Sequence, residues 1–365
     1  MNKVIARFGL DGWCSSVLLG LLFFAAGCAS APKQNTNAIF FPPAPDEPRL
    51  QYLTGFGGES DLREKGGFTE FVFGQERVIR PIWKPYGVTA RPGMLYVADT
   101  QAANVAFVDL KEKRLRYLKP AGRGAFKLPI CAVVDDKGNC FVSDSSLGQV
   151  VVFDKDNVFR GEIGKPGEMK PAGLQIVGNK LYVCDVKNHR VSVFNTETFE
   201  PGPVYPRDPN DEKSKLYGPT NVAVDKNGRV IVSDTGGFAV QVYAADGAHL
   251  QTIGEQGLTP GRFAMPKGIG VDREGRIYVA DSSTALVQMF DADGKLLMYF
   301  GEPTTSGPAG LGGLHLPAGL CIDYDNVDLY QKFVAPGYAI EFLVHVVSQA
   351  GTIKVGTYGF LKKAS

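Results

Sequence analysis

The chain has 365 residues, and its 39 lysines and arginines against 38 aspartates and glutamates give a formal net charge of +1. This balance argues against a nucleic-acid partner, because phosphate binding needs a basic face. The six cysteines form neither a CxxCH haem motif nor a paired CxxC zinc motif, and the chain has neither a glycine-rich phosphate loop nor a GxSxG elbow.

The first predicted element is an export leader over residues 1–27. Two basic residues precede an apolar stretch, residues 17–26, which is too short to span a bilayer. The small residues that end it before Cys28 resemble the bacterial lipobox, whose cysteine is acylated after the leader is cut. The resemblance implies lipidation at Cys28 and, because Ala29 and not aspartate follows, an outer membrane lipoprotein of the cell envelope. A plain signal peptide cut near the same place is the alternative.

Residues 28–48 are small, polar and proline-rich, which predicts a flexible tether. Phe40 and Phe41 are unusual in a tether, and we expect them to dock on the folded domain or on the membrane surface. Residues 49–365 are expected to form one folded domain, since a chain of this length can bury a large core.

A repeat organises the rest of the chain. Six prolines begin the same sequence motif, 44, 42, 48, 47 and 51 residues apart: Pro85, Pro129, Pro171, Pro219, Pro266 and Pro317. In the first five repeats an aspartate follows 14 or 15 residues later: Asp99, Asp144, Asp185, Asp234 and Asp281. Each repeat is typical of four short strands joined by tight turns, as in PKGIGVDREGRIYVADSSTALVQMFDADGKLLMYFG. The pattern predicts an all-β, six-bladed β-propeller.

The third repeat, LYVCDVKNHRVSVF, places Asn188 and His189 just after a strand and resembles the signature of the NHL-repeat family. The resemblance covers residues 82 to about 360 and implies an NHL-type propeller. Similar NHL lipoproteins occur in bacteria rich in exported multihaem cytochromes, so the resemblance permits a role beside electron-transfer or envelope assembly machinery.

The last repeat is irregular. Residues 326–340 match nothing else in the chain and are interpreted as an insertion, partly helical. Residues 342–349 and 352–360 supply the second and third strands, so the last blade lacks its outermost strand. We predict that residues 50–56 pair there and close the ring, because an open ring would leave strand edges exposed.

The repeat aspartates are expected to accept hydrogen bonds from the turn that follows them. The alternative is an acidic ring at the channel mouth that binds a cation. Asn188 and His189 are expected to belong to the same turn structure. NHL-like lyases that cleave hydroxyglycine peptides bind zinc through several histidines, which makes His189 and His315 candidate ligands, with no third ligand identified.

Two further features leave alternatives open. Cys131 and Cys140 lie on adjacent strands and could form a disulfide in an oxidising compartment. A run of basic residues crowds the outer strand of the first repeat, either as a charged edge strand or as a contact with an acidic partner or with anionic lipid. The run comprises Lys111, Lys113, Arg114, Arg116, Lys119, Arg123 and Lys127.

The sequence therefore favours a lipid-anchored envelope propeller that acts as a protein-interaction scaffold. It needs no cofactor beyond the covalent lipid, and its partners are expected to be envelope proteins and the membrane, without nucleic acid. The alternative is a metal-dependent lyase or lactonase that uses the central channel.

Overall fold

The computed structural model describes residues 38–62, 80–118, 120, 122–301 and 312–364. The chain divides into two units, Met1–Asn35 and Thr36–Ser365, and the described residues belong to the second. The predicted leader and Cys28 therefore lie outside the described residues. None of the helices in the described part has the length and apolar character needed to cross a bilayer.

Five of the six sheets contain four consecutive antiparallel strands each. Blade 1 comprises β3 (Pro85–Arg91), β4 (Met94–Asp99), β5 (Asn104–Asp109) and β6 (Arg114–Tyr117), and blade 2 comprises β7 (Pro129–Val134), β8 (Cys140–Asp144), β9 (Gln149–Phe153) and β10 (Phe159–Ile163). Blade 3 comprises β11 (Pro171–Val177), β12 (Lys180–Asp185), β13 (Arg190–Asn195) and β14 (Pro201–Tyr205), and blade 4 comprises β15 (Pro219–Val224), β16 (Val230–Asp234), β17 (Ala239–Tyr243) and β18 (His249–Ile253). Blade 5 comprises β19 (Pro266–Val271), β20 (Ile277–Asp281), β21 (Leu286–Phe290) and β22 (Leu296–Phe300). The short helices α1 (Glu59–Leu62) and η1 (Gly122–Gly124) lie in the connections that enter blades 1 and 2.

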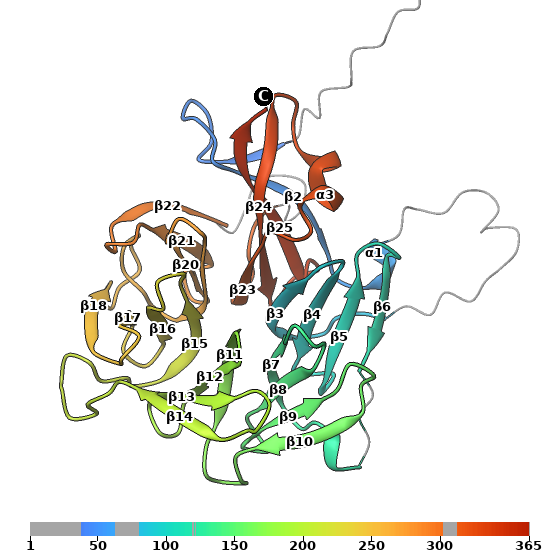
Figure 1. Ribbon diagram of the computed structural model, residues 1–365. Coiled ribbons are helices and arrows are strands. Elements are labelled where there is room, and N and C mark those ends of the chain that lie inside the picture. The colour runs from blue at the N-terminus through green and yellow to red at the C-terminus, as the bar shows by residue number, and fades with distance from the viewer. Residues whose placement is uncertain (1–37, 63–79, 119, 121, 302–311, 365) are drawn as a thin grey trace, which may run out of the picture. The chain divides into compact units, whose positions relative to one another are not determined.

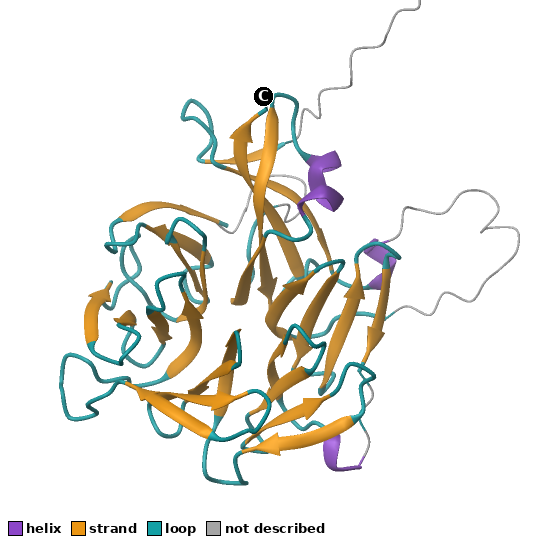
Figure 2. Ribbon diagram, viewed as in Figure 1, coloured by secondary structure: helices purple, strands orange, loops and turns teal. Residues whose placement is uncertain are grey.

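The first strands of the blades form the inner wall of a ring. Contacts run from β3 to β7, β11, β15, β19 and β23 in turn, and β23 contacts β3 again. Figures 1 and 2 show the sheets arranged around a common centre, with β3, β7, β11, β15 and β23 toward the middle. The prediction of an all-β, six-bladed propeller is confirmed.

The repeat motif spans the first two strands of each blade. The proline that begins the motif lies opposite the aspartate that ends it, as in the pairs Pro85–Asp99 and Pro266–Asp281. In the sixth blade Pro317 lies opposite Ser348, so the aspartate is missing there. The spacing of 14 or 15 residues is thus the length of one hairpin.

The sixth blade joins the two ends of the domain. Its five strands are, from the outside inward, β1 (Ile39–Phe41), β2 (Leu50–Phe56), β25 (Val355–Lys363), β24 (Tyr338–Ser348) and β23 (Pro317–Asp323). The predicted closing strand, residues 50–56, has the bounds of β2 and pairs with β25, which confirms the closure. The predicted insertion contains α3 (Val327–Tyr330) and η2 (Gln331–Phe333).

One part of the predicted tether is wrong. Residues 39–41 form β1 and pair with β2, so the sheet extends beyond the expected start of the domain at residue 49. The phenyl ring of Phe41 lies 5.8 Å from that of Phe300 and 6.0 Å from that of Tyr358, measured between centroids. This aromatic packing supplies the burial that a three-residue strand cannot supply alone.

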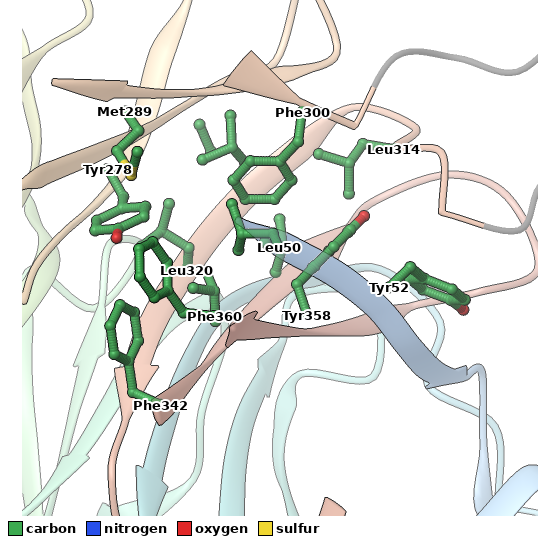
Figure 3. Close-up of a cluster of buried hydrophobic side chains, with 14 residues drawn as sticks. Leu50, Tyr52, Tyr278, Met289, Phe300, Leu314, Leu320, Phe342, Tyr358 and Phe360 are labelled. Carbon is green, nitrogen blue, oxygen red and sulfur yellow. The ribbon is translucent and has the colours of Figure 1, made fainter. Parts of the chain in front are cut away.

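The closure is sealed by a hydrophobic cluster between blades 5 and 6. Leu50 from β2 is fully buried among Phe342 from β24, Tyr358 and Phe360 from β25, and Phe300 from β22 (Figure 3). The rings of Phe342 and Phe360 stack at 4.7 Å. Burying one such side chain contributes about 1.5–3 kcal/mol, which offsets part of the entropy cost of holding the N-terminal strand in place.

Candidate functional site

The six inner strands lie at the same level around the central channel. A Cβ added to Gly87 would lie 2.9 Å from Cα of Cys131, and one added to Gly173 would lie 2.6 Å from Cα of Asn221. A Cβ added to Gly319 would lie 3.1 Å from Cα of Gly87, so the ring of close approaches continues across the closure. Each of these residues stands two positions after its proline. The six prolines, and the turns after the five aspartates, therefore lie at one end of the propeller, which we call the loop face.

Away from the loop face, the inner strands enclose a cavity of about 230 Å³. Thr89, Gln175 and Asn221 contribute polar side chains to its lining, and Nδ2 of Asn221 has no hydrogen-bond partner among the described residues. Cys131 and Cys321 also line it. Burial raises the pKa of Cys131 to about 11, so its side chain is a neutral thiol near neutral pH.

The five repeat aspartates are all fully buried at the loop face. The carboxylate of Asp99 accepts hydrogen bonds from the N–H groups of Gln101 and Ala102 in the following turn, at 3.1 and 3.0 Å. It also accepts from the N–H groups of Trp83 and Lys84 in the loop before the inner strand, at 2.6 and 3.0 Å. Asp144 and Asp281 make the same four kinds of contact. Each carboxylate thus ties two loops together, of which only the turn after the aspartate was expected from the sequence.

The residue after the aspartate links neighbouring blades. The hydroxyl of Ser145 donates to the carbonyl of Pro171 in the next blade, at 2.5 Å. The hydroxyls of Thr235 and Ser282 donate to the carbonyls of Pro266 and Pro317 in the same way. Sequence reasoning missed this role, although serine or threonine recurs after the aspartate in four of the repeats.

His189 occupies a constrained backbone position. The fourth residue after each repeat aspartate has a positive φ, between 48° and 70°: Ala103, Gly148, His189, Phe238 and Ala285. Asn188, just before it, donates from its backbone N–H to Asp185, at 3.3 Å, and from its side-chain amide to Asp185 and to the carbonyl of Glu168. The Asn-His pair therefore forms the turn in blade 3.

The structure separates the two candidate zinc ligands. His189 is exposed on blade 3 and His315 on blade 6, in blades on opposite sides of the ring. His249 in β18 hydrogen-bonds to Gln241. Among the described residues, no group of three or more His, Cys, Asp or Glu side chains is arranged to hold a metal ion.

The fourth histidine belongs to a buried network that sequence reasoning missed. Nε2 of His345 lies 3.0 Å from Oδ2 of Asp323, and Nδ1 lies 2.9 Å from the hydroxyl of Thr357. All three side chains are buried between β23, β24 and β25. Burial would raise the pKa of Asp323, but the hydrogen bond and charge of His345, with further help from Asn326, hold that pKa below its usual value. The network fixes the inner sheet of the blade that lacks the repeat aspartate.

The disulfide alternative is wrong, because the strand register keeps the two cysteines apart. Cys140 lies opposite Val134, whereas Cys131 lies opposite Ser143. Both are buried thiols without a disulfide bond.

The basic run follows the edge of blade 1. Lys111, Arg114 and Arg116 are exposed, and Arg116 lies over the ring of Phe107 at 5.6 Å. Lys113 is half-buried in the same turn. Lys119 lies outside the described residues, and the side chain of Arg123 is likewise not described.

Tyr86 crosses the channel at the loop face. Its ring packs both against the cluster that contains Ile130 and Ala172 and against the cluster that contains Ala318. Burial raises its pKa to about 12, so the phenol is neutral. Nζ of Lys267, from blade 5, lies 5.3 Å from the centroid of the Tyr86 ring, within the range of a cation–π contact.

Unpaired lysines surround this point. Within the described residues, six lysines at the loop face form no salt bridge: Lys84, Lys127, Lys170, Lys187, Lys267 and Lys354. We call these the rim lysines. Cations on one face that lack carboxylate partners among the described residues are suited to binding anionic groups.

Comparison with known proteins agrees with the geometry. The NHL repeat matches residues 169–194, 216–243 and 263–290, which are repeats three, four and five. The chain is an NHL-repeat β-propeller. The match includes the repeat with Asn188 and His189 and extends to two repeats that lack the pair. No curated protein matches the sequence.

Solved structures similar to this NHL propeller share its fold at low sequence identity. A protein of unknown function from Bacteroides thetaiotaomicron has a TM-score of 0.58 and 17% identity, over 86% of this chain and 76% of its own. A gluconolactonase from Xanthomonas campestris has a TM-score of 0.55 and 14% identity, over 89% and 97%. A virginiamycin B lyase from Staphylococcus aureus has a TM-score of 0.52 and 13% identity, over 76% and 95%. At these identities the likeness concerns the fold alone.

Proposed function

We propose that this NHL propeller is a non-enzymatic scaffold that binds envelope proteins through its loop face. One observation carries the proposal: apolar side chains are exposed at equivalent places in four blades, among the rim lysines. They lie one or two residues before the proline of each repeat: Trp83, Tyr217, Met265 and Leu316, with 53%, 56%, 41% and 51% of their surface exposed. Exposed apolar groups gathered on one face are typical of a protein interaction site.

The chemistry of the repeat aspartates also supports a scaffold. Asp99, Asp144 and Asp281 each use their carboxylate to accept four backbone hydrogen bonds. A carboxylate held this way positions loops and has little capacity left for a cation or for proton transfer. The acidic residues at the channel mouth therefore shape the binding surface.

The test is a photo-crosslinking amino acid placed at Tyr217 or, as a matched control, at Val177. Val177 ends inner strand β11 away from the loop face and is 42% exposed, so the two sites are similarly apolar and accessible. In native envelopes we expect position 217 to give a discrete adduct with one protein, identified by mass spectrometry, and position 177 to give none. Equal labelling from both positions, or none from 217, would contradict the proposal.

We propose further that the scaffold is anchored at the outer membrane through lipid on Cys28. The basis is the short apolar stretch that ends in small residues before this cysteine. Cys28→Ser is expected to abolish labelling by a radioactive fatty acid and to release the protein from the membrane fraction. Unchanged membrane retention of this variant, with the leader still cleaved, would refute the anchor and leave the loop-face proposal standing.

The alternative of a metal-dependent lyase or lactonase has a separate test. Purified protein is expected to contain no stoichiometric zinc after dialysis. The double variant His189→Ala, His315→Ala is expected to keep the fold and the position-217 adduct. Stoichiometric metal that disappears in this double variant would replace the scaffold with a metal enzyme.

A further inference from the structure

Two cations stand together at the centre of the loop face. Lys267 is half-buried directly after Pro266, with its ammonium over the Tyr86 ring at 5.3 Å. Burial lowers the pKa of Lys267, and the positive charge of Lys84 lowers it further, while the buried Asp281 opposes both. Within the described residues, neither Lys84 nor Lys267 has a carboxylate within salt-bridge distance. Lys267 lies over the ring of Tyr86 and Lys84 stands two residues before Tyr86, so two like charges share this part of the loop face.

Hydrogen bonds fix the backbone at both lysines. The N–H of Lys84 donates to Asp99 at 3.0 Å, and the carbonyl of Lys267 accepts a hydrogen bond from the hydroxyl of Ser233 in the neighbouring blade. The small side chain of Ala318 fills the equivalent position of blade 6, between the two lysine-bearing blades, which leaves room for Lys267 to reach Tyr86. A site ordered before the ligand arrives loses less entropy on binding.

A third cation and an apolar border complete the site. Lys354, from the loop between β24 and β25, donates to the carbonyl of Gln349 at 3.1 Å. The backbone N–H of Lys354 donates to the carbonyl of Phe56 at 2.9 Å, and Phe56 shares a hydrophobic cluster with Val88 of blade 1, so Lys354 lies on the side of blade 6 that faces blade 1. Burial lowers the pKa of Lys354, and the charge of Asp99 in blade 1 opposes the effect. The exposed side chains of Trp83 and Leu316 belong to the same two blades. The surface thus combines ammonium groups with apolar contact area.

We propose that this channel-mouth site binds an acidic segment of a partner protein, with Lys84 and Lys267 contacting its carboxylates and Trp83 and Leu316 packing against its apolar side chains. The proposal rests on the proposed scaffold function and specifies the chemistry of the partner. A protein segment fits better than nucleic acid for two reasons. The whole chain carries a net charge of only +1. The rim cations are lysines, whereas phosphate groups are most specifically recognised by the bidentate guanidinium of arginine.

Trp83 provides a direct readout of the site. The chain has two tryptophans, Trp13 and Trp83, so Trp13→Phe in the full chain leaves Trp83 as the sole tryptophan. The probe is a hexapeptide of alternating glutamate and leucine, and the control peptide has glutamine in place of each glutamate. We expect a saturable change in Trp83 fluorescence with the acidic peptide alone, weakening as salt is raised.

Lysine variants in the same background locate the site. Lys84→Gln and Lys267→Gln are each expected to weaken binding about tenfold, and the double variant to abolish it within the measurable range. Lys170→Gln removes a rim lysine of blade 3 and is expected to change affinity less than about twofold. A thermal melt of each variant verifies that the fold is retained.

Three results would overturn the inference. The first is an absence of saturable binding. The second is an equal loss of affinity in Lys170→Gln, which would mean diffuse attraction to the whole rim. The third is tighter binding of oligothymidylate than of the acidic peptide. If the position-217 adduct persists in a variant that carries both Lys84→Gln and Lys267→Gln, the scaffold function stands and only the acidic-segment inference fails; if wild-type protein gives no adduct, the scaffold function itself fails.

Discussion

Leu50 in β2 lies opposite Phe360 in β25, so strands from the two ends of the described domain share one sheet. Leu50 is fully buried in the cluster between blades 5 and 6. Phe56 of the same strand shares a hydrophobic cluster with Val88 of blade 1, so loss of β2 would expose an edge and weaken the junctions of the last blade with both of its neighbours. The stability of the whole propeller should therefore depend on its N-terminal strand.

Deletion of residues 39–56 tests this dependence. Leu50, Tyr52 and Phe56 are buried, so their loss is expected to lower the free energy of unfolding by about 5 kcal/mol or more, measured by urea denaturation. Deletion of residues 39–44 removes β1 alone and is expected to have a smaller effect. Identical urea midpoints for both deletions and the intact protein would show that the ring does not depend on this strand.

The left-handed turn position in each blade offers a stabilising substitution. Ala103 has φ of 48° there, a conformation that costs a residue with a Cβ about 1–2 kcal/mol. Ala103→Gly removes that strain, and the greater freedom of glycine in the unfolded chain offsets about 0.5–1 kcal/mol of the gain. We expect a net increase in unfolding free energy of up to about 1 kcal/mol, visible as a higher urea midpoint.

Gly148→Ala is the matched control at the equivalent position of blade 2. It imposes the same strain, and the new Cβ would lie 2.9 Å from the carbonyl oxygen of Met169. The expected effect is destabilisation by at least about 1–2 kcal/mol. If both substitutions shift the midpoint in the same direction, backbone strain is not the governing effect.

The five regular blades were predictable because the repeated interval from proline to aspartate indicates where each hairpin begins and ends. The interval from proline to aspartate is one hairpin, and the missing strand of the last blade required a partner, which residues 50–56 supply. Strand β1 was not predictable, since Ile39–Phe41 is too short for a recognisable alternation and depends on distant rings such as Phe300. The pair of Lys267 and Tyr86 is also invisible in the sequence, because it joins blades 5 and 1 across the channel.

Because each repeat aspartate ties two loops together, its loss is expected to lower the free energy of unfolding strongly. Asp281→Ala would leave the N–H groups of Ala264, Met265, Ser283 and Thr284 without the acceptor that they share. Each unsatisfied buried group costs about 1–3 kcal/mol, so we expect destabilisation of at least about 3 kcal/mol in urea denaturation. Asp291→Ala is the control, since Asp291 accepts two N–H bonds in a solvent-accessible turn of the same blade. A similar loss in both variants would mean that burial of the carboxylate does not set the cost.

The buried pair of Asp323 and His345 predicts how stability depends on pH. The pKa of Asp323 is held below its usual value in the folded protein, so its ionised form is stabilised by folding. Its contribution is fully present above the unfolded pKa of about 3.9 and is lost as pH falls through the lower folded pKa. Asp323→Asn is expected to cost about 3 kcal/mol near neutral pH, because it breaks a buried pair, and progressively less below about pH 4.

Urea denaturation of both proteins between about pH 7 and pH 2.5 measures the difference directly. Asp325→Asn serves as the control, because this neighbouring side chain is exposed and should change stability by less than about 0.5 kcal/mol at any pH. The decisive quantity is the gap in unfolding free energy between wild type and Asp323→Asn, since the other carboxylates titrate in both proteins and their effects cancel. A gap that narrows with acid identifies the ionised Asp323 as the partner of His345. A gap that stays constant would mean that the aspartate acts through shape and neutral hydrogen bonds alone.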